Sequence, residues 1–228
     1  MTCYMCDKPE TGVEHVPPRC LFPEQKDIPN GVDLRKQLIT VPACDEHNTS
    51  KSQDDEYLLY LLVINLPANE TAKNQFFTKI MRSIERNPSL IKRFMANPHP
   101  VIAVDKKTGQ AHHTVAVNVD DARLDSALDH IARALYFHHF RAQWLGDVRT
   151  QPDFLLASLD PDKGRERNKL GEHMVAAADH LFEGKEFYGA NPEAFKYQVL
   201  DGNENTHKLM RLHFYNGCRV SVFFGANG

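Results

Sequence analysis

The sequence predicts an α+β fold, and three observations carry that prediction. The first 51 residues are rich in Pro, Cys and turn-forming residues and show little helical periodicity. Helical patterns dominate from about Ser52 onward. Two later stretches alternate β-branched and polar residues around a turn, which is typical of β-hairpins. We therefore expect two parts, residues 1–66 and a larger helical and hairpin region over 67–228.

The middle of the chain is expected to be helical. Ser52 and the acids after it suit the start of a helix over the apolar run 57–66, and Pro67 ends that run. Over 71–96 we expect two short helices with a break at Asn87-Pro88. One helical face there carries Phe76, Phe77, Ile80, Met81 and Ile84.

Longer helices and two hairpins are expected farther on. A helix over about 120–145 has an apolar stripe of Leu124, Leu128, Ile131 and Leu135, with Trp144 near its end. Another helix is expected near 168–183. The stretch 99–119 predicts a hairpin with a Lys-Thr-Gly turn, and Asn216-Gly217 predicts a second hairpin near the end of the chain.

Composition narrows the class of protein. A chain of 228 residues with 42% hydrophobic residues can bury a core of its own. The longest apolar stretch, LLYLLVINL, is far shorter than the roughly 20 residues of a membrane span, and MTCYMC does not have the basic and apolar pattern of a signal peptide. We therefore expect a cytoplasmic protein. Five cysteines without an export signal favour metal-binding thiols over disulfides.

Two short motifs supply four candidate metal ligands. Cys3 and Cys6 form a C-x2-C motif, and Cys44 and His47 form a C-x2-H motif. Three thiolates and one imidazole are a donor set that tetrahedral structural Zn²⁺ takes. The 37 residues between the motifs exceed the roughly 15 to 20 of a simple zinc ribbon, so a further element is expected between them.

The order of these motifs resembles that of a known family. Glu14 and His15, followed by Val-Pro-Pro, lie between the motifs, and Asn48 and Lys51 follow the second one. This order resembles the HNH endonucleases, whose nuclease core is a ββα-metal finger, over residues 3–55. The resemblance implies an N-terminal zinc-supported ββα-metal HNH finger, followed by the larger helical region.

The resemblance also implies a role for each residue. His15 corresponds to the general base that activates water. Glu14 and Asn48 correspond to the residues that hold the catalytic divalent ion, Mg²⁺ or Mn²⁺. The structural zinc ligands correspond to Cys3, Cys6, Cys44 and His47.

The chain departs from the family pattern at three points. Glu14 stands where Asp is commoner, which lengthens the reach to a metal by one methylene. His47 stands where a cysteine is more usual. The Asn that often steadies the base histidine has no clear match, so Gln37, Thr40 or a backbone carbonyl would have to orient His15.

Other interpretations of these residues stay open. The four ligands could form an inert zinc module in which Glu14 and His15 are ordinary turn residues. A redox role for Cys3 and Cys6 is weaker, because no strand precedes them. Histidines on a hairpin, such as His112 and His113, or on an amphipathic helix, such as those of FHHF, are more often exposed or hydrogen-bonded than bound to a metal. Asp54 and Asp55 could support the catalytic metal, but helix capping is the role that suits their position better.

A net charge of −3 means that any phosphate contact is made through a local basic patch. Such a patch is suggested over 73–93, where six basic residues oppose Glu85. A solvated helix face is the competing interpretation. The candidate nucleic-acid contacts are Lys51, Arg82, Arg86 and Arg93.

The function expected from these residues is that of a metal-dependent HNH endonuclease that cuts or nicks DNA, with use in phage defence or as a toxin effector. The alternative is a catalytically inactive zinc-stabilised module that binds nucleic acid or protein. DNA is the expected partner, and the sequence does not discriminate against RNA. The ligand of 97–228, a partner protein and the oligomeric state stay open.

Overall fold

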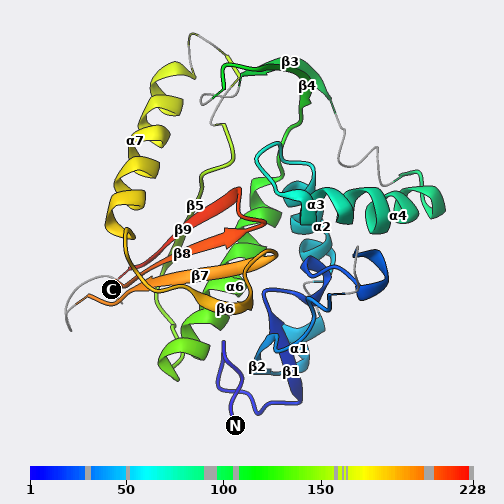
Figure 1. The fold of residues 1–228 in the computed structure, drawn as a ribbon. Coiled ribbons are helices and arrows are strands. Elements are labelled where there is room, and N and C mark those ends of the chain that lie inside the picture. Colours follow the sequence, from blue (N-terminus) through cyan, green and yellow to red (C-terminus); the bar gives the residue numbers. More distant parts are fainter. Residues whose placement is uncertain are drawn as a thin grey trace.

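The computed structural model describes residues 1–28, 32–49, 52–89, 97–104, 108–156, 159, 160, 162, 164–202 and 208–225. Helices and strands are both present, which confirms the α+β prediction. The strands form two separate two-stranded hairpins and one five-stranded sheet. Figure 1 shows the sheet in front of a long helix, with the N-terminal segment below and to the right.

The N-terminal segment folds as a hairpin followed by two helices. Strand β1 (Gly12–Val16) pairs with β2 (Ile39–Ala43) in antiparallel register. Two 3₁₀ turns, η1 (Arg19–Leu21) and η2 (Gln25–Asp27), lie in the connection between the strands. Helix α1 (Asp45–Thr49) follows β2 directly, and α2 (Ser52–Val63) contains most of the predicted apolar run.

The next helical stretch differs from the regular face that its sequence predicts. Helix α3 (Glu70–Gln75) passes through the π-helical turn η4 (Phe76–Ile80) into α4 (Met81–Arg86), and Asn87 ends the helix. A π turn adds a residue to the helical repeat and rotates the side chains that follow. Ile80 is 1% exposed, as its place on the predicted apolar face implies, whereas Phe77, which was predicted on the same face, is 71% exposed. Residues 90–96 of the second predicted helix lie outside the described residues.

A separate hairpin follows, as predicted. Strand β3 (His99–Val104) pairs with β4 (Ala111–Ala116). Gly109 has a φ of +70° in the turn, a conformation that glycine adopts without steric cost. This hairpin lies at the top of the molecule in Figure 1, away from the five-stranded sheet.

Helix α6 (Asp121–Phe140) is the central helix of the fold. Its predicted stripe is confirmed, because Leu124, Leu128, Ile131 and Leu135 are each at most 2% exposed. The helix contacts β5 (Val148–Pro152) of the sheet, and it also contacts α2 and β2. It ends earlier than predicted, since Arg141 takes the left-handed conformation with a φ of 57° and Trp144 lies beyond it.

The five-stranded antiparallel sheet has the order β5-β9-β8-β7-β6. Its strands are β5 (Val148–Pro152), β6 (Tyr188–Asn191), β7 (Phe195–Leu200), β8 (Lys208–Phe214) and β9 (Cys218–Phe224). The β8–β9 hairpin confirms the turn predicted at Asn216-Gly217. A side chain at Gly217 would begin 1.7 Å from the carbonyl oxygen of Pro67, so this turn packs against backbone that tolerates only glycine. Strands β5, β6 and β7 were not predicted.

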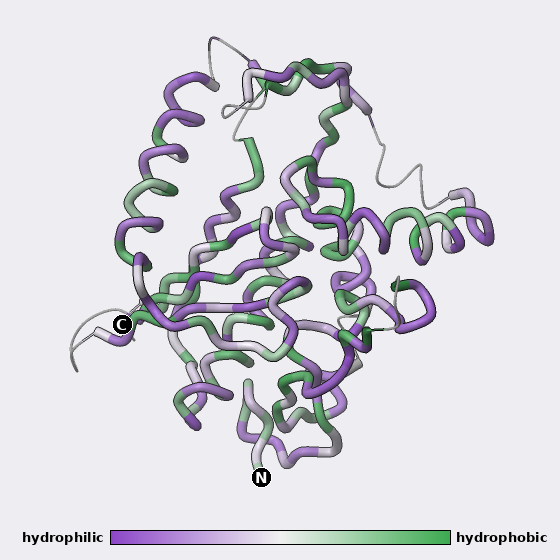
Figure 2. Tube along the Cα trace, viewed as in Figure 1, coloured by the Kyte–Doolittle hydropathy of each residue, from purple (hydrophilic) through white to green (hydrophobic). Residues whose placement is uncertain are grey.

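Helix α7 (Arg165–Leu181) covers one side of the molecule and is mostly hydrophilic, as Figure 2 shows. Its contact with the sheet is partly ionic. Arg211 of β8 is 1% exposed and donates a 2.8 Å hydrogen bond to Oδ1 of Asp179 in α7. Oδ2 of Asp153 lies 2.5 Å from the same guanidinium. Two carboxylates therefore compensate the buried arginine.

Buried side chains from 1–66 and from 67–228 form a single hydrophobic cluster. Tyr4 and Val41 of the N-terminal segment belong to it, together with Leu128 of α6 and Phe214 of the sheet. The division into two parts remains a prediction from the sequence. In the part of the chain that the structure describes, no helix is both long and apolar enough to cross a membrane.

Candidate metal centre and hairpin site

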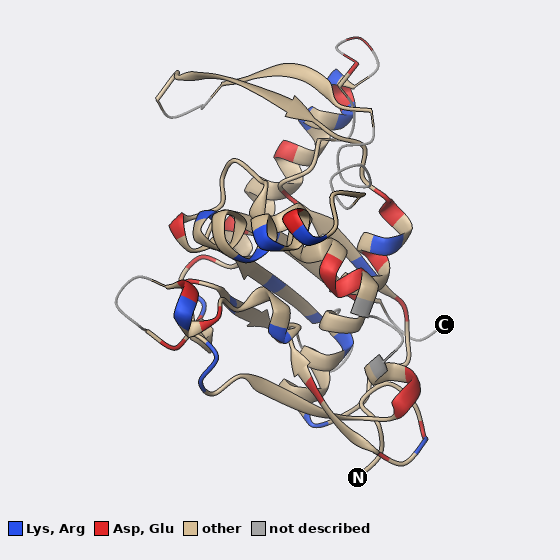
Figure 3. Cartoon of the chain, turned by 90° about the vertical axis from the view of Figure 1, so that its right-hand side faces the viewer, with Lys and Arg blue, Asp and Glu red and all other residues tan. Residues whose placement is uncertain are grey.

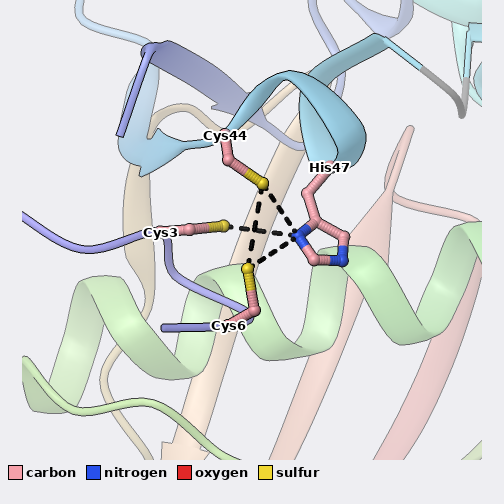
Figure 4. Close-up of side chains that lie close together, drawn as sticks. All are labelled: Cys3, Cys6, Cys44 and His47. Carbon is pink, nitrogen blue, oxygen red and sulfur yellow. Dashed lines mark hydrogen bonds between the residues drawn. The ribbon is translucent and has the colours of Figure 1, made fainter. Parts of the chain in front are cut away.

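Four side chains from the two predicted motifs converge on one point. Figure 4 shows Cys3 and Cys6 reaching it from the N-terminal segment and Cys44 and His47 from the start of α1. Nδ1 of His47 lies 3.4, 3.5 and 3.3 Å from the sulfur atoms of Cys3, Cys6 and Cys44. The sulfur atoms of Cys6 and Cys44 are 3.8 Å apart. All four ligand atoms lie within 4.8 Å of one another, close enough to hold a metal ion.

These separations match those around a tetrahedral zinc ion. Zn–S bonds of about 2.3 Å and Zn–N bonds of about 2.0–2.1 Å at tetrahedral angles separate two sulfurs by about 3.8 Å, and sulfur from nitrogen by about 3.5 Å. Four protein donors leave no open position, which is characteristic of a structural site. The residues therefore fit a structural Zn²⁺.

Local backbone bonds hold the ligands in place. The N–H of Cys3 donates to the carbonyl of Lys8, and that of Tyr4 to Pro42 of β2, which closes the first motif against the hairpin. The N–H groups of His47 and Asn48 both donate to the carbonyl of Cys44, which starts α1. The pKa of the Cys44 thiol is lowered, chiefly by the backbone N–H of His47, which favours the thiolate that a metal requires.

A residue distant in the sequence supports the first motif. Nε2 of Gln143, just beyond α6, donates to the carbonyl of Cys3 at 2.6 Å and to that of Cys6 at 2.9 Å. His130 of α6 also approaches the centre, with its ring centroid 6.4 Å from that of His47. Sequence reasoning missed both residues, because nothing in their local pattern relates them to metal ligands more than 80 positions earlier in the chain.

Glu14 and Asn48 lie on the same side of β1. Nδ2 of Asn48 is 3.5 Å from the position that a Cβ atom of Gly12 would take. Gly12 and Glu14 share a face of the strand, because side chains alternate with a period of two. Glu14 is 7% exposed on this face. The structure thus brings the predicted acid and amide to one face of the hairpin.

His15 follows Glu14 in β1 and therefore projects from the opposite face of the ribbon. Its partner across the hairpin is Thr40, and Glu14 is paired with Val41. Side chains directly opposite each other in an antiparallel pair have Cβ atoms about 4.5–5.5 Å apart. Thr40, one of the residues proposed above to orient the base, is therefore the side chain nearest to His15 across the ribbon. Gln37, the other, is exposed and has a φ of 52°.

The buried side chain of Tyr4 lies where the negative charges of Glu14, Asp55 and Asp129 act on it. Tyr4 is 0% exposed, and its hydroxyl has no hydrogen-bond partner among the described residues. Burial raises the pKa of Tyr4, and the charges of Glu14, Asp55 and Asp129 raise it further. The phenol is therefore neutral at physiological pH. Asp129, like the other α6 residues, was not among the predicted site residues.

Three of the four basic side chains of the predicted patch that the structure describes have partners. Lys73 pairs with Glu70, Nζ of Lys79 donates to the carbonyl of Cys20, and the guanidinium of Arg82 makes two hydrogen bonds to Asp27. Arg86 is exposed and has no ion pair with another described residue. Figure 3 shows positions of basic and acidic residues interspersed over the side of the molecule that carries α3 and α4. Lys51 and Arg93 lie outside the described residues, as does Lys92.

The remaining histidine motifs form no second centre in the residues described. His112 and His113 are exposed on β4, while His138 and His139 lie near the end of α6. Over the described ranges, the four-residue cluster is the only group of three or more His, Cys, Asp or Glu side chains that could hold an ion.

No protein-family model, curated protein or solved structure matches this chain.

Proposed function

We propose that the chain is a metal-dependent endonuclease of the HNH type that hydrolyses phosphodiester bonds in DNA, with a structural Zn²⁺ in the cluster of Cys3, Cys6, Cys44 and His47. One observation carries the proposal. The cluster joins the first turn of α1 to the N-terminal segment, and Asn48 of that turn lies beside Gly12, on the face of β1 that carries Glu14. A hairpin and a helix that meet at this cluster thus carry an acid and an amide on one face of the ribbon.

The donors suit a divalent cation. A carboxylate from Glu14 and an amide oxygen from Asn48 are ligands that Mg²⁺ and Mn²⁺ accept, and Mg²⁺ commonly keeps several waters besides one or two protein ligands. When bound, such an ion would neutralise charge on the scissile phosphate and on the leaving oxygen. The remaining chemistry falls to His15.

The proposed role of His15 is to remove a proton from the attacking water, whose oxygen then forms a bond to phosphorus while an ester P–O bond breaks. The leaving oxygen takes up a proton. Because Glu14 and His15 project from opposite faces of the ribbon, the scissile phosphate would have to lie along its edge, where both faces can be reached. Thr40 is the neighbour that can orient the imidazole.

The position of Glu14 and His15 on opposite faces of the ribbon also suits a second function. Glu14 is 7% exposed and His15 lies on the other face, an arrangement that a zinc-stabilised binding module without catalytic activity would also have. Such a module needs the four zinc ligands but has no use for an imidazole at position 15.

Plasmid nicking and linearisation over a series of divalent ions separate the two functions. Removal of a general base typically costs a factor of about 10² to 10⁴ in rate, so His15→Ala should lose cleavage by that factor while keeping its zinc, melting temperature and DNA affinity. Asn48→Ala should lose activity that added Mg²⁺ or Mn²⁺ partly restores. His113→Ala, a change to an exposed histidine of β4, is the matched control and should cut like the wild type.

The binding module replaces the nuclease if the wild-type protein, with its full zinc content, cleaves neither DNA nor RNA with any divalent ion. The base assignment fails if His15→Ala cleaves as fast as the wild type.

A further inference from the structure

A cavity of about 490 Å³ lies where the N-terminal hairpin meets the end of α6 and the edge of the five-stranded sheet. Its wall is formed by residues 37–40, by His138 and Arg141, by residues 188–190 and by Tyr197. The two sides are tied together by Nδ2 of Asn191, which donates a 2.8 Å hydrogen bond to the carbonyl of Lys36. The volume lies within the roughly 300–1,000 Å³ of small-molecule sites.

The lining combines a cation with aromatic rings. Arg141 is exposed and has no ion pair with another described residue, and its charge acts on both His138 and Tyr197. The rings of Tyr188 and Tyr197 have centroids 5.4 Å apart at 35°. Tyr197 is buried, whereas Tyr188 is partly exposed. The Tyr188 ring also meets that of His139, with centroids 4.9 Å apart at 79°. Nδ1 of His138 is buried with no hydrogen-bond partner in the described structure.

The backbone around the cavity is unusual. Arg141 and Gln37 have φ angles of 57° and 52°, which side chains other than Asn, Asp and Gly seldom adopt. Gly189 has a φ of 119°, and a Cβ there would lie 3.0 Å from the carbonyl oxygen of Phe195. Strained residues of this kind cluster at ligand sites, where the surrounding structure holds them in place. Arg141, which lines the cavity, is one of these residues.

The cavity adjoins the proposed nuclease site. Thr40 lines it, and Thr40 is the cross-strand partner of His15. The cavity therefore reaches the strand position that is paired with His15.

We propose that this cavity binds one unpaired nucleotide of a nucleic-acid strand, with the base stacked on Tyr188 and a phosphate held by Arg141. The proposal rests on the proposed function for the identity of the strand as substrate. Bases stack on aromatic side chains with little dependence on sequence, and arginine supplies the phosphate contact. A base within a duplex is stacked on its neighbours and paired, so the site selects single-stranded, gapped or locally opened nucleic acid.

The test is binding of a fluorescein-labelled 12-nucleotide single strand, measured by anisotropy without added Mg²⁺ or Mn²⁺ in the His15→Ala background, so that cleavage plays no part. Arg141→Ala and Tyr188→Ala should each weaken binding by at least about fivefold, and Tyr188→Phe should retain most of it because the ring remains. Arg141→Ala should also reduce the slope of log affinity against log salt by about 0.7. Arg167→Ala, the same charge loss at an exposed position of α7, should change neither.

A 2-aminopurine base in the strand reports stacking directly. Its fluorescence should fall on binding to the wild type and to Tyr188→Phe but remain unquenched with Tyr188→Ala, a difference that a loss of folding alone would not produce if melting temperatures match. Competition of a free mononucleotide against the labelled strand tests whether the cavity binds a strand or a small nucleotide ligand.

The assignment is overturned if neither variant changes binding, if duplex binds as tightly as single strand and is weakened equally, or if a mononucleotide binds while the oligonucleotide does not. Failure of this proposal is distinct from failure of the nuclease. If the wild type cleaves plasmid but Arg141→Ala and Tyr188→Ala bind the single strand as tightly as the protein without these changes, only the nucleotide site is rejected. Strand binding that requires Arg141 and Tyr188 without cleavage under any condition rejects only the nuclease.

Discussion

The side-chain amide of Gln143 donates a 2.6 Å hydrogen bond to the carbonyl oxygen of Cys3, 140 residues earlier in the chain. A second bond, of 2.9 Å, reaches the carbonyl of Cys6. Both bonds fix the backbone of the first metal-binding motif against the end of α6. The metal centre therefore depends on the C-terminal region for its geometry, although all four ligands lie in the first 47 residues.

Substitution of Gln143 by Ala should weaken zinc binding. Groups that support metal ligands without touching the metal typically contribute a factor of about 10 to 100 in affinity, and we expect about tenfold here because the bonds go to backbone carbonyls rather than to the ligands themselves. Competition with a chromophoric chelator measures the affinity. Gln110→Ala, at an exposed position near the β3–β4 turn, is the control. Equal zinc affinity in the two variants would show that Gln143 does not support the centre.

The ligand set could be predicted from sequence because each pair of ligands is local. Two residues separate Cys3 from Cys6, and the same spacing relates Cys44 to His47, so each half of the site has its own signature. Gln143 and His130 carry no such signature. They reach the centre only because α6 packs against the hairpin, and that packing depends on the whole fold.

The fold was predictable to a similar extent. The stripe on α6 and the β8–β9 turn follow from periodicity and turn chemistry, which act over a few residues. Strands β6 and β7 alternate poorly between buried and exposed residues, so period-two patterning does not reveal them. The π turn at Phe76–Ile80 is likewise set by tertiary packing, including the buried amide of Gln75, which bonds to the carbonyl of Leu21 and the hydroxyl of Tyr215.

Removal of one zinc thiolate should remove the metal. Purified wild-type protein is expected to contain about one Zn²⁺ per chain, because the four donors form a closed tetrahedral set. Cys44→Ser should lose that zinc and melt at a lower temperature, since metal binding contributes to folding of the segment. Cys20→Ser is the control, because Cys20 is not in the cluster and its sulfur, among the described residues, donates to the carbonyl of Asp55. Metal analysis and melting curves for both variants test the prediction, which fails if Cys44→Ser retains stoichiometric zinc.

The two described arginines of the predicted basic patch should behave differently. Arg82 binds both carboxylate oxygens of Asp27, and the pKa of that carboxyl is lowered chiefly by this contact. Asp27 has a side chain only 6% exposed, so Arg82→Ala should lower the melting temperature by leaving a buried carboxylate without its partner. Arg86 is exposed, so Arg86→Ala should leave stability unchanged.

DNA binding separates them further. If Arg86 contacts a phosphate, Arg86→Ala should reduce the slope of log affinity against log salt by about 0.9 for duplex DNA and weaken binding to all sequences alike. The measurement is a salt titration of duplex binding by anisotropy, with Arg82→Ala as the comparison at equal folded fraction. An unchanged slope for Arg86→Ala would leave it as solvated surface.

His213 makes stability depend on pH. Burial, followed by the charge of Arg211, lowers its pKa to about 4 in the folded protein, whereas an unfolded histidine has a pKa of about 6.5. Between these two values the unfolded chain binds more protons than the folded one, so stability rises with pH across this window. Stability is therefore fully present above about pH 6.5 and declines as pH falls toward 4. At pH 5 the loss from this group is about 2 kcal/mol.

Urea unfolding of wild type and His213→Gln at pH 7.5 and 5.0 tests this assignment. Glutamine removes the titrating group while keeping a side chain that can bond to Gln198, the present partner of the imidazole. Between the two pH values the wild type should lose about 2 kcal/mol more than the variant, because every other titrating group is common to both. Zinc content is measured at each pH, since protonation of His47 would release the metal from both proteins. His173→Gln, at an exposed position of α7, should keep the wild-type pH dependence. Parallel stability losses in wild type and His213→Gln would show that another group controls the acid sensitivity.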